Sequence, residues 1–361
     1  MMDQFWMRHA LELGKKAWGR AAPNPMVGAV LVRDGKKIGE GFHQGVGCPH
    51  AERMALGGVH GACFGATAYV TLEPCSHAGR TGPCAQALID TKVSRVVIGA
   101  IDPNPLVAGR GISLLQDAGI EVSVGVEEAA CLDLIRPFSW RMRTGRPWVH
   151  GKWAMSADGK IASLSGDSKW ISGEESRAWV HRLRGGMDAI IVGSGTALAD
   201  DPMLNPRPWC HRTPTRILID RRGRTPSTCR LARSVVEGPV LLITSPNAPQ
   251  TWKRDWRSKG VEIIEAENGL EVVGEISQSR GWTEILIEGG GGLLGAAFAS
   301  GLVNELHIFV APKILGGVDA PGPVGDPGAL NMVEARKLCF VESQISGPDI
   351  RLRYLVESVP N

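Results

Sequence analysis

A set of metal-ligating and acidic side chains lies between residues 50 and 84. The segment PHAE contains His50 and Glu52, and the segment TLEPCSHAGRTGPC, which begins at residue 71, contains Cys75 and Cys84. Histidine and cysteine thiolate are the ligands that Zn²⁺ prefers, and a catalytic zinc site has three protein ligands and one open position. His50, Cys75 and Cys84 supply that set, and Glu52 is close enough in sequence to accept and return a proton beside the metal.

The two cysteines are unusually far apart. In nucleoside and tRNA deaminases, which share the order His-x-Glu and then Pro-Cys, the second cysteine follows the first by three positions. Here Cys84 follows Cys75 by nine positions, and the intervening residues include His77 and Arg80. Both side chains suit an anionic phosphate, and Pro83 suits the first turn of a helix. We therefore expect an inserted loop that binds substrate phosphate beside the zinc.

Three segments of the second half could bind phosphate groups. They are KWAMSADGKIA at 152–162, DAIIVGSGTALADDPMLNPR at 188–207 and ILIEGGGGLLG at 285–295. Gly290, Gly292 and Gly295 have the spacing G-x-G-x-x-G after an expected strand, which lets backbone N–H groups approach a pyrophosphate. No acidic residue ends a strand about 20 residues later, as it would in a Rossmann nucleotide site. Arg184 and Arg207 flank the second segment and are suited to clamping a phosphate.

The composition predicts a globular protein of two domains. The chain has 361 residues, of which 43% are hydrophobic and 21% charged, and its formal net charge is +3. Domains usually have about 100–200 residues, and this charge is too small to indicate a nucleic-acid partner. No apolar run approaches the roughly 18 residues of a membrane span. The eight cysteines are scattered and the N-terminus does not resemble a signal peptide, so we expect a cytoplasmic protein.

The elements that must position these residues alternate between helix and strand in both halves. In the first half we expect helices near 3–18, 51–58, 83–91 and 111–119, and strands near 27–32, 68–72, 93–98 and 121–126. In the second half we expect strands at 148–154, 188–192, 215–219, 239–244, 284–288 and 306–310, with a helix near 173–184. This alternation predicts α/β layers. The basic stretch 136–147 is interpreted as the junction between the halves.

The first half resembles the deaminase half of the bifunctional riboflavin-biosynthesis deaminase/reductase family. The resemblance is carried by PNPMVGAVLV, GFHQGVGCPHAE and TLEPCSHAGRTGPC, although Gly82 stands where the family usually has proline. It implies a cytidine-deaminase-like α/β/α domain over residues 1–145, with zinc ligands His50, Cys75 and Cys84. Glu52 would be the proton shuttle. The pyrimidine and phosphate pocket would contain Asn24, His43, His77 and Arg80.

The three segments of the second half resemble the reductase half of the same family, which is similar in fold to dihydrofolate reductase. The resemblance implies an α/β domain over residues 146–361 that uses NADPH as hydride donor, and it is weakest across 221–280 and after 320. Lys152, on the first strand, is a further candidate for contact with the ribosyl chain or its phosphate. The implied cofactor-binding residues are Ala154, Trp170, Thr196, Asp200, Gly290, Gly291, Gly292, Leu293, Leu294, Gly295 and Ala296. The implied substrate-binding residues are Ser168, Arg184, Leu204, Arg207 and Glu288.

The resemblance implies two consecutive reactions on a phosphorylated pyrimidine: hydrolytic deamination of the ring and reduction of the ribosyl chain to ribityl. Two alternatives stay open at this point. A deaminase of another nucleobase, such as the tRNA adenosine type with an appended domain, would have the short cysteine spacing and a basic face. A zinc-stabilised scaffold without activity would have a fourth protein ligand, for which His77 and Cys48 are the nearby candidates. Apolar strands in the second half make a homo-oligomer formed through that half plausible.

Overall fold

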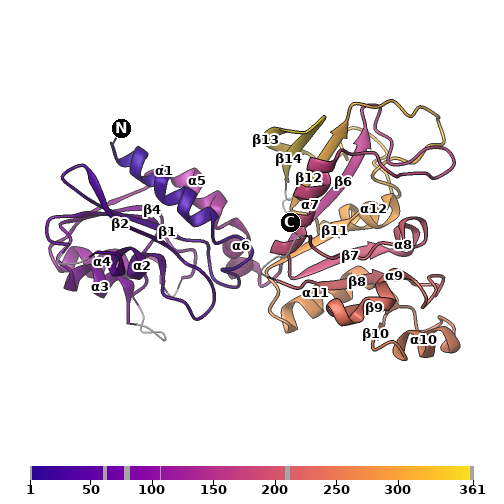
Figure 1. Ribbon diagram of the computed structural model, residues 1–361, viewed down its shortest axis with the longest axis horizontal. Coiled ribbons are helices and arrows are strands. Elements are labelled where there is room, and N and C mark those ends of the chain that lie inside the picture. The colour runs from indigo at the N-terminus through magenta and orange to yellow at the C-terminus, as the bar shows by residue number, and fades with distance from the viewer. Residues whose placement is uncertain (1, 60–62, 77–81, 106, 208–211, 358–361) are drawn as a thin grey trace. The chain divides into compact units, whose positions relative to one another are not determined.

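The computed structural model describes residues 2–59, 63–76, 82–105, 107–207 and 212–357. The chain forms two compact units, Met1–Gly145 and Arg146–Asn361. Figure 1 labels the helices and strands of each. Within the described residues, no helix is both long enough and apolar enough to cross a membrane.

The first unit contains a five-stranded sheet with the strand order β2-β1-β3-β4-β5. β1 and β2 form an antiparallel hairpin, β1 pairs antiparallel with β3, and β3, β4 and β5 are parallel. The strands are β1 (Gly28–Arg33), β2 (Lys36–Phe42), β3 (Thr67–Leu72), β4 (Arg95–Ala100) and β5 (Glu121–Val124). The helices are α1 (Met2–Lys15), α2 (Ala51–Gly57), α3 (Cys84–Asp90), α4 (Arg110–Asp117), α5 (Glu128–Leu134) and α6 (Arg136–Thr144).

Two hydrophobic layers cover the faces of this sheet. Met7 and Leu11 of α1 and Leu134 of α5 pack with Val30 and Val97 on one face. Alanines and leucines of α2, α3 and α4 pack on the other face, where successive strand residues such as Leu31 and Val96 point. The unit is therefore a three-layer α/β/α structure, and Figure 1 shows α1 and α5 on the side of the sheet opposite α2 and α3.

The second unit contains a nine-stranded sheet with the order β10-β9-β8-β7-β11-β6-β12-β14-β13. The pairs from β10 to β12 are parallel, and β14 and β13 are antiparallel additions at one edge. The strands are β6 (Trp148–Ser156), β7 (Ala189–Gly193), β8 (Thr215–Ile219), β9 (Val240–Thr244), β10 (Glu262–Glu265), β11 (Glu284–Glu288), β12 (Glu305–Ala311), β13 (Leu338–Ser346) and β14 (Asp349–Val356).

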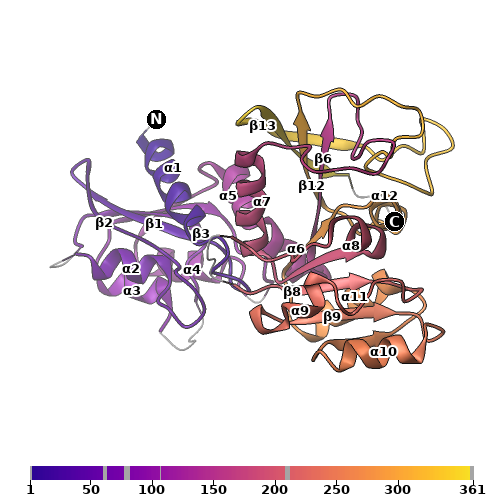
Figure 2. The ribbon, with the colours of Figure 1, turned by 45° about the vertical axis from the view of Figure 1, so that its right-hand side comes forward.

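Helices cover both faces of the second sheet. On one face Leu270 and Val273 of α11 and Leu294 of α12 pack with Ile285 and Ile308. On the opposite face Trp179 of α7 contacts residues of β12. The helices, labelled in Figures 1 and 2, are α7 (Glu174–Gly186), α8 (Ser194–Asp200), α9 (Arg230–Arg233), α10 (Gln250–Arg257), α11 (Gly269–Ser279) and α12 (Gly291–Ala299), with a 3-10 turn at Val235–Glu237.

The predicted junction at 136–147 contains the boundary between the two units, which lies between Gly145 and Arg146. Residues 136–144 of this stretch form α6, which belongs to the first unit. Its proline lies in the first turn, where a missing N–H disturbs no helical hydrogen bond, and Gly145 ends the helix with a positive φ of 69°. Proline and charge therefore mark the start and the exposed surface of a helix here.

Candidate active sites

Two strand-to-helix connections, from β2 to α2 and from β3 to α3, bring the predicted zinc ligands together. His50 is the residue before α2, Cys84 is the first residue of α3, and Cys75 follows β3. The Cys75 Sγ lies 3.6 Å from the Nδ1 of His50, and the Cys84 Sγ lies 3.4 Å from the same nitrogen. Zinc bonds of about 2.3 Å to sulfur and 2.1 Å to nitrogen give a tetrahedron whose S···N edge is about 3.6 Å. The ligand atoms therefore fit a zinc ion.

One of the cysteines is already prepared to act as a thiolate. A hydrogen bond from the Cys84 thiol, and then one from His50, lower the pKa of Cys75 to about 4, against the desolvation that raises it. The backbone N–H of Cys84 also donates to the Cys75 sulfur, at 3.3 Å. The side-chain hydrogen bond with Cys75 and burial raise the pKa of Cys84. Because thiolates bind metal and thiols do not, Cys75 is the ligand suited to a cation at neutral pH, and Cys84 would lose its proton when a metal binds.

Glu52 is held in the first turn of α2, and only 5% of it is exposed. Burial raises the pKa of this carboxyl group to about 7, and the negative charge of Cys75 adds to the effect. A group with a pKa near the working pH can both accept and donate a proton. The structure therefore places the Glu52 carboxyl group beside the candidate metal ligands, and its role as proton shuttle stays a prediction.

Two of the four predicted pocket residues lie side by side at this site. The Asn24 side-chain amide is 3.0 Å from the Nε2 of His43, whose other ring nitrogen lies 3.3 Å from the carbonyl of Pro49. The rings of His43 and His50 are 5.4 Å apart. Burial lowers the pKa of His43 and so favours its neutral form. His77 and Arg80 lie outside the described residues.

Sequence reasoning missed two residues that support the zinc loop. The buried carboxylate of Glu73 accepts backbone N–H bonds from Asp102, Gly109, Gly111 and Ile112. The Arg53 guanidinium donates to the Gly82 carbonyl at 2.7 Å, two residues before the ligand Cys84. Glu73 and Arg53 lie next to the motif residues in the sequence. Their hydrogen-bond partners lie about 30 to 40 residues away, so no local sequence pattern reveals these contacts.

In the second unit, a cavity of about 530 Å³ lies at the carboxyl ends of the parallel strands. This edge of an α/β sheet is where ligands usually bind. Five predicted cofactor residues line the cavity: Thr196, Gly290, Gly292, Leu293 and Ala296. Gly289 and Gly290 have positive φ values of 64° and 80°, so glycine suits this turn before α12.

The other predicted cofactor residues have different surroundings. Leu294 is fully buried in the hydrophobic core, and Gly295 packs against the backbone of residues 325 and 326. Trp170 is exposed, with the Arg177 guanidinium 4.7 Å from its ring centre. Asp200 accepts a hydrogen bond from Ser168 at 2.8 Å. Ala154 and Gly291 are outside the set of cavity-lining residues.

A buried ion pair stands at the end of β11. The Arg184 guanidinium, from α7, bonds to both carboxylate oxygens of Glu288, at 2.5 and 2.9 Å. Lys152 pairs with Glu288 in the strand register of β6 and β11. Burial opposes ionisation of Glu288, but Arg184 and Lys152 together hold its pKa below the usual value. Burial lowers the pKa of Lys152. Two cations thus meet one carboxylate, which suits contact with an anionic substrate.

The predicted substrate segment around Leu204 is fixed by residues that sequence reasoning missed. Leu204 is buried with a positive φ of 59°, and the next carbonyl, that of Asn205, accepts from Arg184 at 3.3 Å. Arg216, only 1% exposed, donates to the Met203 carbonyl and the Asn205 side chain. The predicted residue Arg207 is exposed, 3.0 Å from the Met203 sulfur. Arg216 lies on β8, which is distant in sequence from α7, so only the fold reveals that it supports this segment.

Arginines that follow β8 line the same cavity and were also missed. They are Arg221, Arg222 and Arg224. Arg224 donates to the Ser194 hydroxyl at 2.8 Å. Within the described part of the chain, Arg221 and Arg222 have no ion-pair partner. The signal in the sequence was RILIDRRGR, an expected strand followed at once by a cluster of basic residues.

Two family models match the two units. The cytidine and deoxycytidylate deaminase zinc-binding region matches residues 1–100, and the RibD C-terminal domain matches residues 147–352. These matches confirm the predicted fold classes. They also identify the His50, Cys75 and Cys84 cluster as part of a zinc-binding deaminase region.

Full-length relatives share both units. The riboflavin biosynthesis protein RibD of Actinobacillus pleuropneumoniae is 43% identical over 99% of this chain and 96% of its own, and that of Escherichia coli is 40% identical over 98% and 99%. The Thermotoga maritima diaminohydroxyphosphoribosylaminopyrimidine deaminase/5-amino-6-(5-phosphoribosylamino)uracil reductase is 34% identical, with a TM-score of 0.85 over 98% of this chain and 99% of its own. The alternative of a tRNA-type deaminase is thereby not supported. This chain belongs to the RibD family, the bifunctional deaminase/reductases of riboflavin biosynthesis.

Proposed function

We propose that residues 1–145 deaminate 2,5-diamino-6-ribosylamino-4(3H)-pyrimidinone 5′-phosphate and that residues 146–361 then reduce its ribosyl chain with NADPH. The observation that carries this proposal is the buried Glu52 carboxyl beside three converging zinc-ligand atoms, in a chain whose other unit has a nucleotide-sized cavity. The T. maritima relative is named for the same two activities.

In the first unit, His50, Cys75 and Cys84 would hold zinc, which when bound makes water acidic enough to be a nucleophile near neutral pH. Glu52 takes the proton from the attacking water and delivers it to the departing ammonia. Its burial supports this role, because a carboxyl group with a pKa of about 7 accepts and returns a proton at little cost. Asn24 and His43 would orient the pyrimidine ring, and His77 and Arg80 its phosphate.

In the second unit, the glycine turn at 289–292 and the cavity beside Thr196 would hold NADPH, which supplies hydride chemistry when bound. Ala154, Trp170 and Asp200 would also contact this cofactor. Arg184, Arg207 and Lys152 would bind the substrate phosphate and ribosyl chain, with Ser168, Leu204 and Glu288 completing the pocket. These residues position the two reactants, which is the main contribution a protein makes to hydride transfer.

Removal of the metal separates the two activities. We expect a strong chelator, followed by dialysis, to abolish ammonia release from the diaminopyrimidine substrate while NADPH oxidation with already deaminated substrate continues. Addition of Zn²⁺ should restore ammonia release. Deamination that persists in metal-free protein would contradict the proposed first reaction, whereas loss of both activities would show that the second unit also depends on a bound metal.

The arginines after β8 predict which dinucleotide is used. Replacing both Arg221 and Arg222 by alanine should raise KM for NADPH at least about 10²-fold, because two charge-assisted hydrogen bonds to a 2′-phosphate are lost and each contributes about 1.5–3 kcal/mol. KM for NADH, which lacks that phosphate, should hardly change. Arg254→Ala is the matched control, because Arg254 is an exposed arginine of α10 outside the cavity. Equal effects on NADPH and NADH would rule out a 2′-phosphate site.

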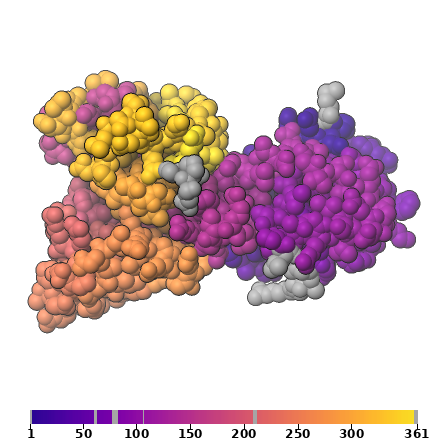
Figure 3. All heavy atoms as spheres, turned by 180° about the vertical axis from the view of Figure 1, so that it is seen from behind, coloured from indigo at the N-terminus to yellow at the C-terminus, as the bar shows by residue number. Residues whose placement is uncertain are grey.

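A second copy of the chain is the proposed partner of the second unit. Leu330 and Val333 are 91% and 94% exposed, and β13 is the edge strand of the sheet with Phe340 on it. The C-terminal segment that carries these side chains forms a continuous part of the surface in Figure 3. An exposed apolar area beside an unpaired strand edge is typical of a subunit interface.

Charge on β13 should break this proposed dimer. Phe340→Glu is expected to convert a dimer into a monomer in light scattering, because a carboxylate would be buried without a partner at the interface. Phe5→Glu, on α1 of the first unit, is the matched control, since Phe5 and Phe340 are both 59% exposed. A wild-type chain that is monomeric at micromolar concentration would contradict the proposal directly.

A further inference from the structure

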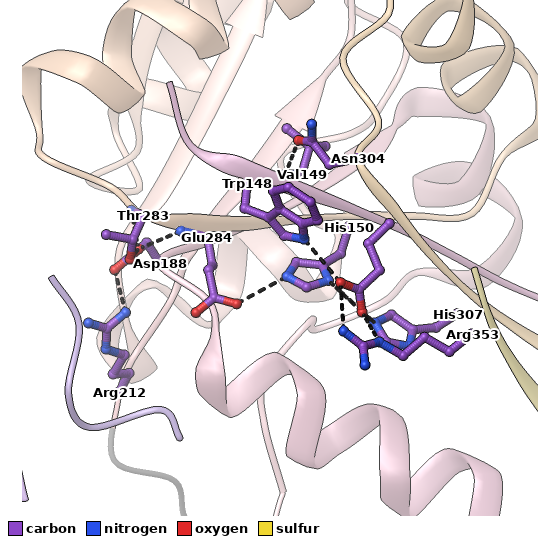
Figure 4. A network of polar contacts seen from close by, with 11 residues as sticks. Trp148, Val149, His150, Asp188, Arg212, Thr283, Glu284, Asn304, His307 and Arg353 are labelled. Carbon is purple, nitrogen blue, oxygen red and sulfur yellow. Dashed lines mark hydrogen bonds and ion pairs between the residues drawn. The ribbon is translucent and has the colours of Figure 1, made fainter. Parts of the chain in front are cut away.

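A second group of metal-ligating side chains is buried in the other unit. His150 lies on β6, and Glu305 and His307 lie on the neighbouring parallel strand β12. Their exposed fractions are 5%, 4% and 4%. Figure 4 shows the rings of His150 and His307 beside each other. None of the three is part of the proposed substrate or cofactor pocket, so the reductase reaction does not explain them.

The ligand atoms of these residues are spaced as around one ion. The Nδ1 of His150 lies 3.3 Å from the Nε2 of His307, which lies 3.2 Å from the Oε1 of Glu305. The third distance, from His150 Nδ1 to Glu305 Oε1, is 3.9 Å. These separations are at or above the upper end of hydrogen-bond lengths, about 3.2 Å. Ligands about 2.1 Å from a tetrahedral zinc are about 3.4 Å apart.

Surrounding groups hold two of these ligands, His150 and Glu305, in place. Glu284 lies 3.1 Å from the other ring nitrogen of His150, and a carboxylate in this position commonly orients a metal-bound histidine. Arg353 donates to Glu305 Oε1 at 2.7 Å, and Trp148 donates to Oε2 at 3.1 Å. A carboxylate oxygen has two lone pairs, so Oε1 keeps one for a metal.

The cluster has an excess of negative charge, which favours a bound cation. Glu284 and Glu305 carry two negative charges against the single positive charge of Arg353, so the cluster has a formal net charge of −1 with both histidines neutral. The nearby Arg351 has its own carboxylate partner, Glu342. Trp179 of α7 lies over His307, with ring centres 5.0 Å apart, and closes the cluster from that side. Because all three ligand residues are buried, an ion would enter as the unit folds.

We propose that His150, Glu305 and His307 bind a divalent transition-metal ion, in the class of Zn²⁺, which joins β6 to β12. Two imidazoles and one carboxylate favour such an ion over Mg²⁺ or Ca²⁺, which take oxygen ligands. This site is separate from the zinc site of the first unit, since it uses other residues and contains no cysteine. It gives the second unit a cross-link that does not depend on the deaminase reaction.

The zinc content of the full-length chain tests this proposal. Chain purified with Zn²⁺ and dialysed should hold two zinc ions, His307→Leu should hold one, and His50→Ala should also hold one. With Co²⁺ in place of zinc, the ion that remains in His50→Ala should give visible bands without the near-ultraviolet thiolate band, because its ligands are nitrogen and oxygen. One zinc per wild-type chain, or equal zinc content in wild type and His307→Leu, would overturn the proposal and show a hydrogen-bonded network or adventitious zinc only.

A milder variant protects the test from misfolding. Glu284→Gln keeps all three ligands and should weaken binding of the second zinc 10–100-fold, the usual effect of losing a carboxylate behind a histidine ligand. Glu262→Gln is the matched control, because Glu262 is an exposed glutamate paired with Arg280 and far from the cluster in sequence. Unchanged affinity in Glu284→Gln, measured by competition with a chelator, would also count against the site.

Discussion

Replacing Glu52 by glutamine is expected to leave the zinc content unchanged and to slow deamination at least about 10²-fold, the usual contribution of a general acid–base group. Glutamine has nearly the same shape, so α2 and the adjacent ligand His50 stay in place. Its amide neither accepts nor donates a proton near neutral pH. The activation of water and the departure of ammonia would therefore both lose their proton carrier.

The second activity of the chain supplies the control for this variant. NADPH oxidation with already deaminated substrate should proceed at the wild-type rate in Glu52→Gln, since that reaction belongs to the other unit. Zinc analysis should give the same metal content as wild type, because Glu52 is not a ligand. A variant that releases ammonia at a normal rate would remove Glu52 from the mechanism, whereas a variant without zinc would leave a structural defect as the cause.

The zinc site was predictable because its residues belong to short, ordered motifs. His50 and Glu52 are two positions apart at a helix start, and Cys75 and Cys84 lie at the end of a strand and the start of a helix. Each such boundary constrains where a side chain can point. The long interval between the cysteines also predicted a loop, although its residues His77 and Arg80 lie outside the described structure.

The support of both sites was not predictable, because it comes from contacts between distant parts of the chain. Arg216 donates to Asn205, and Glu73 accepts from the N-terminus of α4; neither pair forms a sequence pattern. His150 and Glu305 are neighbours only because β6 and β12 pair in parallel register. Such contacts depend on strand order, which a single sequence does not specify across a nine-stranded sheet.

Replacing Arg184 by methionine is expected to have the largest effect on the second unit. Glu288 would lose both hydrogen bonds of its ion pair and remain buried. Removal of one partner from a buried pair usually costs about 3–5 kcal/mol, and Lys152, which still faces Glu288, places the expected loss at the lower end. The melting temperature of this unit should fall by at least about 6 °C, and NADPH oxidation should be lost because a proposed phosphate ligand is gone.

A second substitution separates stability from function in this prediction. Adding Glu288→Gln to Arg184→Met removes the unpaired charge, and apolar or neutral replacement of a buried pair is often close to neutral in stability. Lys152 is then left without that carboxylate, and burial, which lowers the pKa of Lys152, favours its neutral form. The double variant should therefore melt near the wild-type temperature and still fail to oxidise NADPH with substrate. If stability and activity return together, Arg184 and Glu288 hold the fold and have no separate role in binding substrate.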